Sequence, residues 1–195
     1  AMMYPCRDME QLCYKEMLTD NTVKKMPRKE DMVLDAANIC RLGKDWVYLE
    51  SDSGNAKAYE WLCEQYPSIN IEKVNFYAGV HIDSTIVPLR QGLAICNKPR
   101  VKSKRYLPPC MKDWEIIWVE DVTAQVFYQY PYASKWIGLN MLSINKDTVI
   151  VDTAQLELST VLEKKGFTVI PHTLRHSRTL GGGHHCVTLD TWREN

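Results

Sequence analysis

The residues of this sequence best suited to chemistry surround a cysteine near its C-terminal end. A glycine run, Gly181–Gly183, precedes His184, His185 and Cys186. Glycine has no side chain, so other groups can approach the backbone closely there, and Val187–Leu189 favour an extended chain beyond it. We therefore predict that Cys186 lies in a short strand and is presented as a nucleophile, because the thiolate form of a cysteine is nucleophilic.

Acidic and basic groups occupy comparable positions earlier in the sequence. Asp35 lies in one short apolar stretch, and His81 and Asp83 open another. Residues i and i+2 of a strand share a face, so His81 and Asp83 are expected to point the same way, as are His184 and Cys186. A thiol, an imidazole and carboxylates at the openings of converging strands predict nucleophilic catalysis with a general acid/base.

The stretches that carry these groups recur along the chain. Each combines polar residues with a short apolar run, and the interval between them is roughly 50 residues, a period typical of repeat architectures. The four stretches are Val33–Ile39, His81–Val87, Ile137–Leu142 and His184–Leu189.

The residues that follow the first stretch predict two more strands and a helix. Trp46–Leu49 and Ile71–Phe76 have the composition of strands. Between them we predict a helix over about 53–66 with Ser53 as its N-cap, since apolar residues fall at i, i+3, i+4 and i+7 from Tyr59. Each unit is therefore expected to contain strand, strand, helix and strand in that order.

The later units follow the same plan with one exception. In the third unit Thr148–Val151 and Phe167–Ile170 are predicted strands, and Gly166 ends a helix over about 154–165. In the middle unit Leu93–Cys96 and Glu115–Val119 are predicted strands, but the prolines between them favour a loop-rich connection. Repeated mixed units of this kind predict a propeller-like α/β fold.

The composition is typical of one soluble domain over residues 1–195. The chain is 45% hydrophobic, which is enough for a substantial core. Its 24 Lys and Arg residues equal its 24 Asp and Glu residues, so we expect small-molecule partners and no binding to nucleic acid or membrane. The sequence shows neither an apolar run of about 18 residues nor a signal-peptide pattern at its start. Seven cysteines without paired spacing favour a reducing compartment, and we expect a cytoplasmic protein.

Five motifs, in order, resemble the C-terminal part of the glycine amidinotransferase family, which belongs to the superfamily of guanidine-modifying enzymes. The resemblance covers about residues 30–190. It implies a five-bladed, pseudo-symmetric α/β propeller of the pentein type, built from ββαβ units. The motifs are Leu34–Asn38, Arg41–Asp45, His81–Thr85, Ser134–Trp136 and Leu180–Cys186.

The same resemblance assigns roles to individual residues. It implies that Cys186 is the nucleophile, that His81 is the acid/base, and that Asp35 orients His81. Asp83 matches the carboxylate that contacts the substrate guanidinium. Arg100 lies where the family binds the donor's carboxylate, and Ser134 matches a further substrate-binding position. The resemblance implies neither a metal nor a cofactor.

These roles agree with the chemistry of guanidinium, a planar and resonance-stabilised cation. Carboxylates would orient it, and its charge would favour the thiolate of Cys186. His81 would protonate the leaving amine, so that arginine loses ornithine and leaves an amidino group on sulfur. An amine acceptor, for which glycine is the first expectation, would then collect that group. The partners are thus an arginine donor and an amine acceptor.

The chain is shorter than the resemblance requires. Five units of roughly 50 residues need about 250, whereas residues 32–190 contain three units and a closing strand, and 1–31 match poorly apart from a helix-like stretch at Met9–Leu18. We therefore expect an incomplete, open propeller that lacks an N-terminal portion. Three outcomes stay open, namely weak guanidinium binding, a site completed across a homodimer, and an inactive chain.

Two other functions compete with amidino transfer. An arginine deiminase-like hydrolase would use the same nucleophile with water as the acceptor. A zinc-binding, non-enzymatic module would use the ligands that zinc prefers, but Pro171 disfavours the helix that would bring His172 and His176 together. The zinc ligands would come from His172, His176, His184, His185 and Cys186.

Asn38 and Asn140 are interpreted as strand-edge hydrogen bonders.

Overall fold

The computed structural model describes residues 24, 26–27, 31–76, 79, 81–123, 134–175, 179 and 181–189. The predicted helix-like stretch Met9–Leu18 lies outside these residues. The chain divides into two compact units, Ala1–Ile82 and Asp83–Asn195. The described part contains three sheets of three strands each, one in the first unit and two in the second.

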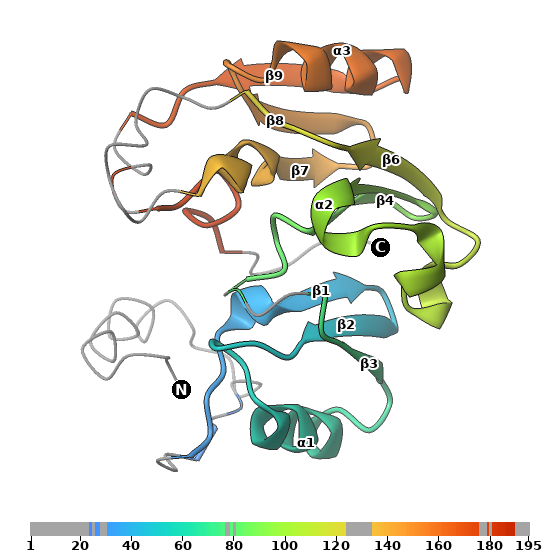
Figure 1. The fold of residues 1–195 in the computed structure, drawn as a ribbon, viewed down its shortest axis with the longest axis vertical. Helices are drawn as coiled ribbons and strands as arrows, with labels where there is room; N and C mark the ends of the chain where they lie inside the picture. Colours follow the sequence, from blue (N-terminus) through green and yellow to red (C-terminus); the bar gives the residue numbers. More distant parts are fainter. Residues whose placement is uncertain are drawn as a thin grey trace. The chain divides into compact units, whose positions relative to one another are not determined.

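The first unit is one strand, strand, helix, strand repeat (Figure 1). Its strands lie in the order β1-β2-β3, with β1 antiparallel to β2 and β2 parallel to β3. A parallel neighbour needs a crossover, which α1 supplies. Leu62 on α1 packs against Tyr48 and Ile71 of the sheet, and these three side chains form the core of the unit. The elements are β1 (Ile39–Leu42), β2 (Asp45–Leu49), α1 (Ala56–Gln65) and β3 (Asn70–Val74).

The start of α1 differs from the prediction. Asn55, not Ser53, is the N-cap, and its Oδ1 accepts the backbone N–H of Ala58 at 3.1 Å. Ser53 is buried and its hydroxyl donates to Asn38 Oδ1 at 2.6 Å. Because that hydroxyl is already engaged, the helix begins after the next available capping side chain.

The second unit contains two further repeats that share one core. Each sheet again pairs its first two strands antiparallel and its last two parallel. The core joins Ile95 of the middle sheet to Val149, Val151 and Leu162 of the last repeat. The strands are β4 (Ile86–Arg90), β5 (Leu93–Asn97), β6 (Glu115–Val119), β7 (Leu142–Asn145), β8 (Thr148–Asp152) and β9 (Thr168–His172).

The connections of the second unit follow the sequence. The predicted loop-rich middle connection is confirmed, since it holds only α2 (Lys98–Val101) and two 3-10 turns. The last repeat has the expected helix, α3 (Leu156–Lys164), with Gly166 after it at φ +85°, a backbone conformation that favours glycine. No helix in the described ranges has the length and apolar character needed to cross a bilayer.

The α/β repeat fold is therefore as predicted, but the motif stretches are not strands where strands were expected. Ala36–Asn38 form a 3-10 turn before β1, and residues 83–85 form a turn before β4. The predicted strand at His184–Leu189 is wrong as well, because 184–187 are turns in which the N–H of Val187 donates to Gly183 O at 3.3 Å. The shared-face argument for residues i and i+2 therefore does not apply to these stretches.

The α3 helix offers a test of the core. Leu162 is fully buried, whereas its neighbour Val161 is 39% exposed. We predict that Leu162→Ala lowers the free energy of unfolding by about 2–5 kcal/mol, the range for removing a buried leucine side chain. Val161→Ala is the matched control and should change it by less than about 1 kcal/mol, since exposed positions are tolerant. Urea unfolding measures both, and equal losses would contradict this account of the core.

Candidate active site

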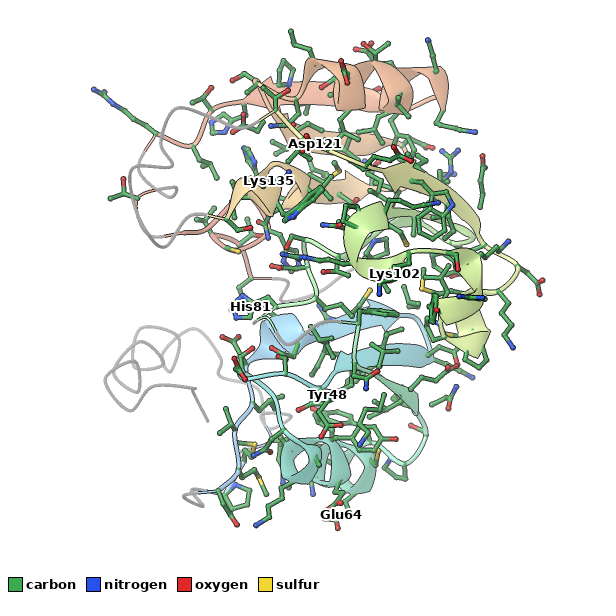
Figure 2. The ribbon with its side chains drawn as sticks, in the orientation of Figure 1. Tyr48, Glu64, His81, Lys102, Asp121 and Lys135 are labelled. Carbon is green, nitrogen blue, oxygen red and sulfur yellow. The ribbon has the colours of Figure 1, made fainter. Side chains whose placement is uncertain are left out.

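The first unit brings Asp35 and His81 together. Asp35 Oδ2 lies 3.0 Å from His81 Nε2, and both side chains are partly buried. Two further hydrogen bonds hold Asp35 in place. Its backbone N–H donates to Ser53 O at 2.8 Å, and its Oδ1 accepts the N–H of Ala37 at 3.2 Å. Ile82, directly after the histidine, donates its N–H to Ala37 O at 2.9 Å. His81, labelled in Figure 2, is thus anchored beside the turn that carries Asp35.

This pair has the form of an oriented acid/base. A carboxylate hydrogen-bonded to one ring nitrogen sets the orientation of an imidazole and stabilises its protonated form. The Asp35–His81 contact joins residues from two separate predicted motifs. The contact brings together the two residues that the sequence analysis paired, and the role of Asp35 in orienting His81 stays a prediction.

The second unit gathers a separate cluster around Asp83. Three groups approach its Oδ2 atom: Asn140 Nδ2 at 2.8 Å, His185 Nδ1 at 3.1 Å and Cys186 Sγ at 3.5 Å. The Asp83 side chain is only 10% exposed. One carboxylate oxygen with its two lone pairs is therefore crowded by donors.

Asn140 also determines the path of the loop that carries Cys186. Its Oδ1 accepts the backbone N–H of Cys186 at 3.1 Å, and its backbone O accepts that of His184 at 2.9 Å. Gly183 packs directly on this residue, where an added Cβ would lie 2.8 Å from Asn140 O. Asn140 forms hydrogen bonds as predicted, but it follows the 3-10 turn and lies before β7, not on a strand.

The surroundings of Cys186 keep its thiol protonated. Removal of water from around the sulfur, followed by the negative charge of Asp83, raises the pKa of Cys186 to about 12. Hydrogen bonds from the Gly183 backbone and the Asn140 amide act in the opposite direction. The residue as a whole is exposed, yet desolvation of the sulfur is the largest cause, so a cation bound beside Asp83 would be needed to favour the thiolate.

The two remaining predicted site residues lie in the second unit. Arg100 Nη1 donates to Ser84 Oγ at 3.0 Å and to Thr85 Oγ1 at 2.8 Å, the hydroxyls that directly follow Asp83 in the chain. Ser134 caps the 3-10 turn Lys135–Leu139, where its Oγ accepts the N–H of Trp136 at 3.3 Å.

The described histidines near Cys186 contact each other or Asp83. His172 Nδ1 lies 3.1 Å from His184 Nε2, and His185 faces Asp83. His176, the remaining histidine of the zinc hypothesis, lies outside the described residues. Within the part of the chain that the structure describes, no three His, Cys, Asp or Glu side chains are grouped to hold a metal ion.

A cavity of about 480 Å³ lies elsewhere in the second unit, between the end of β6 and α3. Trp118, Asp121, Gln155 and Leu158 are among its lining residues. None of the predicted site residues lines this cavity, and we assign it no part in the chemistry.

Comparison with known proteins shows which proteins this chain resembles. A scan against protein-family models finds no match. Inosamine-phosphate amidinotransferase 1 of Streptomyces griseus is 44% identical over 169 residues, which are 84% of this chain and 48% of that protein. A solved structure of a Streptomyces griseus inosamine-phosphate amidinotransferase matches all of this chain and 63% of its own, with 36% identity and a TM-score of 0.88. The chain is a homologue of the amidinotransferases.

More distant relatives extend this result. The L-arginine:L-lysine amidinotransferase of Pseudomonas savastanoi pv. phaseolicola is 29% identical, with 82% of this chain and 44% of that protein aligned. Mitochondrial glycine amidinotransferase of Xenopus laevis is also 29% identical, over 82% of this chain and 38% of that protein. The dimethylarginine dimethylaminohydrolase of Pseudomonas aeruginosa, 16% identical over 95% of this chain and 67% of its own, shares the fold with a TM-score of 0.71.

These comparisons confirm the predicted resemblance to amidinotransferases and the pentein-type α/β fold. The chain spans about half the length of the curated relatives it matches. The comparisons do not favour glycine over other acceptors, because the inosamine-phosphate enzyme has a higher sequence identity to this chain than glycine amidinotransferase has.

The raised pKa of Cys186 predicts how the thiol reacts in the absence of substrate. Only the thiolate attacks iodoacetamide, so the alkylation rate at Cys186 should rise by about tenfold per pH unit between pH 7 and 10 without levelling off. The alkylation rate of a thiol with an ordinary pKa levels off above about pH 9. Mass spectrometry of the peptide that contains Cys186 measures the rate.

Asp83→Asn tests the cause of this shift. Loss of the negative charge lowers the pKa of Cys186, and alkylation at pH 8 should become several-fold faster. Asp121→Asn is the control, since Asp121 forms an ion pair with Lys135 and not with the cysteine; both residues are labelled in Figure 2. Identical rates for Asp83→Asn and the unmodified chain would rule out Asp83 as a cause.

Proposed function

We propose that this chain carries the catalytic residues of an amidinotransferase that moves an amidino group from arginine to an amine. The observation that carries the proposal is the placement of a thiol and a backbone-anchored loop on the carboxylate of Asp83, in a chain homologous to amidinotransferases. Because the chain spans about half of its curated relatives, the activity of the whole protein is part of the proposal.

Guanidinium binding is the first step. A planar cation matches a carboxylate in a bidentate arrangement, and Asp83 is a partly buried carboxylate next to Cys186. The bound positive charge would offset the charge of Asp83, so the pKa of Cys186 would fall and the thiolate would form where it is needed. Arg100 is proposed to bind the carboxylate of the donor, and Ser134 is proposed to contact another part of the donor.

Amidino transfer then takes place in two displacements. The Cys186 thiolate attacks the guanidinium carbon, a C–S bond forms, and the C–N bond to the ornithine nitrogen breaks as His81, oriented by Asp35, supplies a proton to that nitrogen. In the second displacement His81 takes a proton from the acceptor amine, the amine attacks the amidino carbon, and the C–S bond breaks to release the thiolate.

The acceptor is proposed to be a primary amine, and the relatives rank the candidates. The relative with the higher identity is named for inosamine phosphate, and the two at 29% identity are named for lysine and glycine. Inosamine phosphate is therefore the first acceptor to test. Hydrolysis is the second candidate reaction, because a dimethylarginine dimethylaminohydrolase shares the fold.

The covalent step has a direct test. Incubation with arginine should add the mass of one amidino group to the chain, located at Cys186 by peptide mapping, and release one equivalent of ornithine. Cys186→Ala should show neither product, and Cys96→Ala, which alters a buried thiol in β5, is the matched control. Release of citrulline and ammonia instead would favour the hydrolase, and the absence of any product would contradict an active chain.

Acceptor choice is tested on the amidinated chain. Inosamine phosphate, lysine and glycine, added separately, should remove the amidino group at different rates, with inosamine phosphate fastest. Mass spectrometry follows both the loss of the adduct and the guanidino product. A faster reaction with glycine would reverse the ranking, and a rate per chain that rises with protein concentration would support a site completed across a homodimer.

A further inference from the structure

The side chain of Asn140 joins two residues on which the proposed chemistry depends. It is 2% exposed and comes directly after the 3-10 turn Lys135–Leu139. Its Nδ2 donates to Asp83 Oδ2 at 2.8 Å, and its Oδ1 accepts the backbone N–H of Cys186 at 3.1 Å. We infer that Asn140 is a positioning residue that holds the guanidinium-binding carboxylate and the nucleophile in one fixed arrangement. This inference rests on the proposed function.

The chemistry of the partners determines the orientation of the amide. A backbone N–H only donates, so the atom facing Cys186 must be the amide oxygen. A carboxylate only accepts, so the nitrogen must face Asp83. Asparagine is a short side chain that offers both functions, and aspartate would offer only acceptors.

The backbone of Asn140 adds further connections to the same loop. Its O accepts the N–H of His184, and its own N–H donates to Ile137 O at 3.0 Å. The absence of a side chain at Gly183 is required by this contact, since an added Cβ would lie 2.7 Å from Asn140 Cβ. The loop therefore cannot shift without disturbing Asn140, and Asn140 cannot shift without disturbing Asp83.

Asn140 also helps Asp83 when the thiol ionises. A thiol can donate to Asp83 Oδ2, but a thiolate cannot, so Asp83 then loses one of the three groups that face it. The Asn140 amide keeps its hydrogen bond to the carboxylate in both states, and it favours the thiolate form of Cys186. The amide is thus suited to hold two negative groups side by side until the substrate cation arrives.

The first unit supplies a matched control. Asn38 precedes β1 as Asn140 precedes β7, is completely buried, and also packs against a glycine, Gly54. Its Nδ2 donates to Leu49 O and to Ser51 Oγ, both at 2.8 Å. Asn38 therefore has the same burial and the same position in its repeat, with backbone and hydroxyl partners in place of Asp83 and Cys186.

The test compares Asn140→Asp with Asn38→Asp in the full chain. Asn140→Asp keeps the acceptor for the Cys186 N–H, removes the donor to Asp83 and places a second carboxylate beside the thiol. We expect iodoacetamide to alkylate Cys186 at pH 8 roughly 10- to 100-fold more slowly, the range for one hydrogen bond to a charged group. Asn38→Asp should leave this rate unchanged even where it lowers the unfolding midpoint.

The double variant Asp83→Asn with Asn140→Asp restores an amide and carboxylate pair with the charge exchanged. Its alkylation rate should exceed that of Asn140→Asp, since only one carboxylate remains. In the arginine assay, Asn140→Asp should slow amidination by a similar 10- to 100-fold. Wild-type alkylation in Asn140→Asp, or equal slowing by Asn38→Asp, would overturn the inference. Alkylation needs no substrate, so it tests Asn140 even if arginine proves not to react with the unmodified chain.

Discussion

The carboxylate of Asp83 imposes the constraint on which the second unit depends. A negative charge with little access to water needs hydrogen bonds from the protein, and an amide, an imidazole and a thiol all approach one oxygen of Asp83. The thiol is the weakest of these donors and the one whose proton the chemistry would remove. The loop from Gly183 to Cys186 and the turn before β7 are both arranged so that these donors reach the same point.

Repetition explains how a small chain builds such a site. The three sheets have the same strand order and pairing, and Asp35, Asp83 and Asn140 lie in the segments that precede the first strands of the repeats. Asn38 and Asn140 occupy the same place in two repeats, yet the Asn38 amide donates to a backbone carbonyl and the Asn140 amide donates to the carboxylate of Asp83. The strands thus provide a common scaffold, while the turns that precede them differ in chemistry.

Much of this architecture could be predicted from local sequence. The predicted strand Glu115–Val119 has the same bounds as the observed strand. A short apolar run is a local signal for a strand, so it can be read from the sequence alone. The motif stretches were mispredicted because an apolar run reveals neither a preceding turn nor the exact strand start, as at Ile86. Asn140 could not be assigned, since its partners lie 57 and 46 positions away in the chain and only the folded repeat brings them together.

The protonated state of Cys186 also bears on the durability of the protein. Peroxide and related oxidants react with thiolates, and a cysteine oxidised past sulfenic acid is not readily recovered. A sulfur whose pKa is raised to about 12 presents almost no thiolate at neutral pH, although the residue is exposed. Removal of water from around the sulfur, together with the negative charge of Asp83, therefore shields the cysteine from oxidative loss.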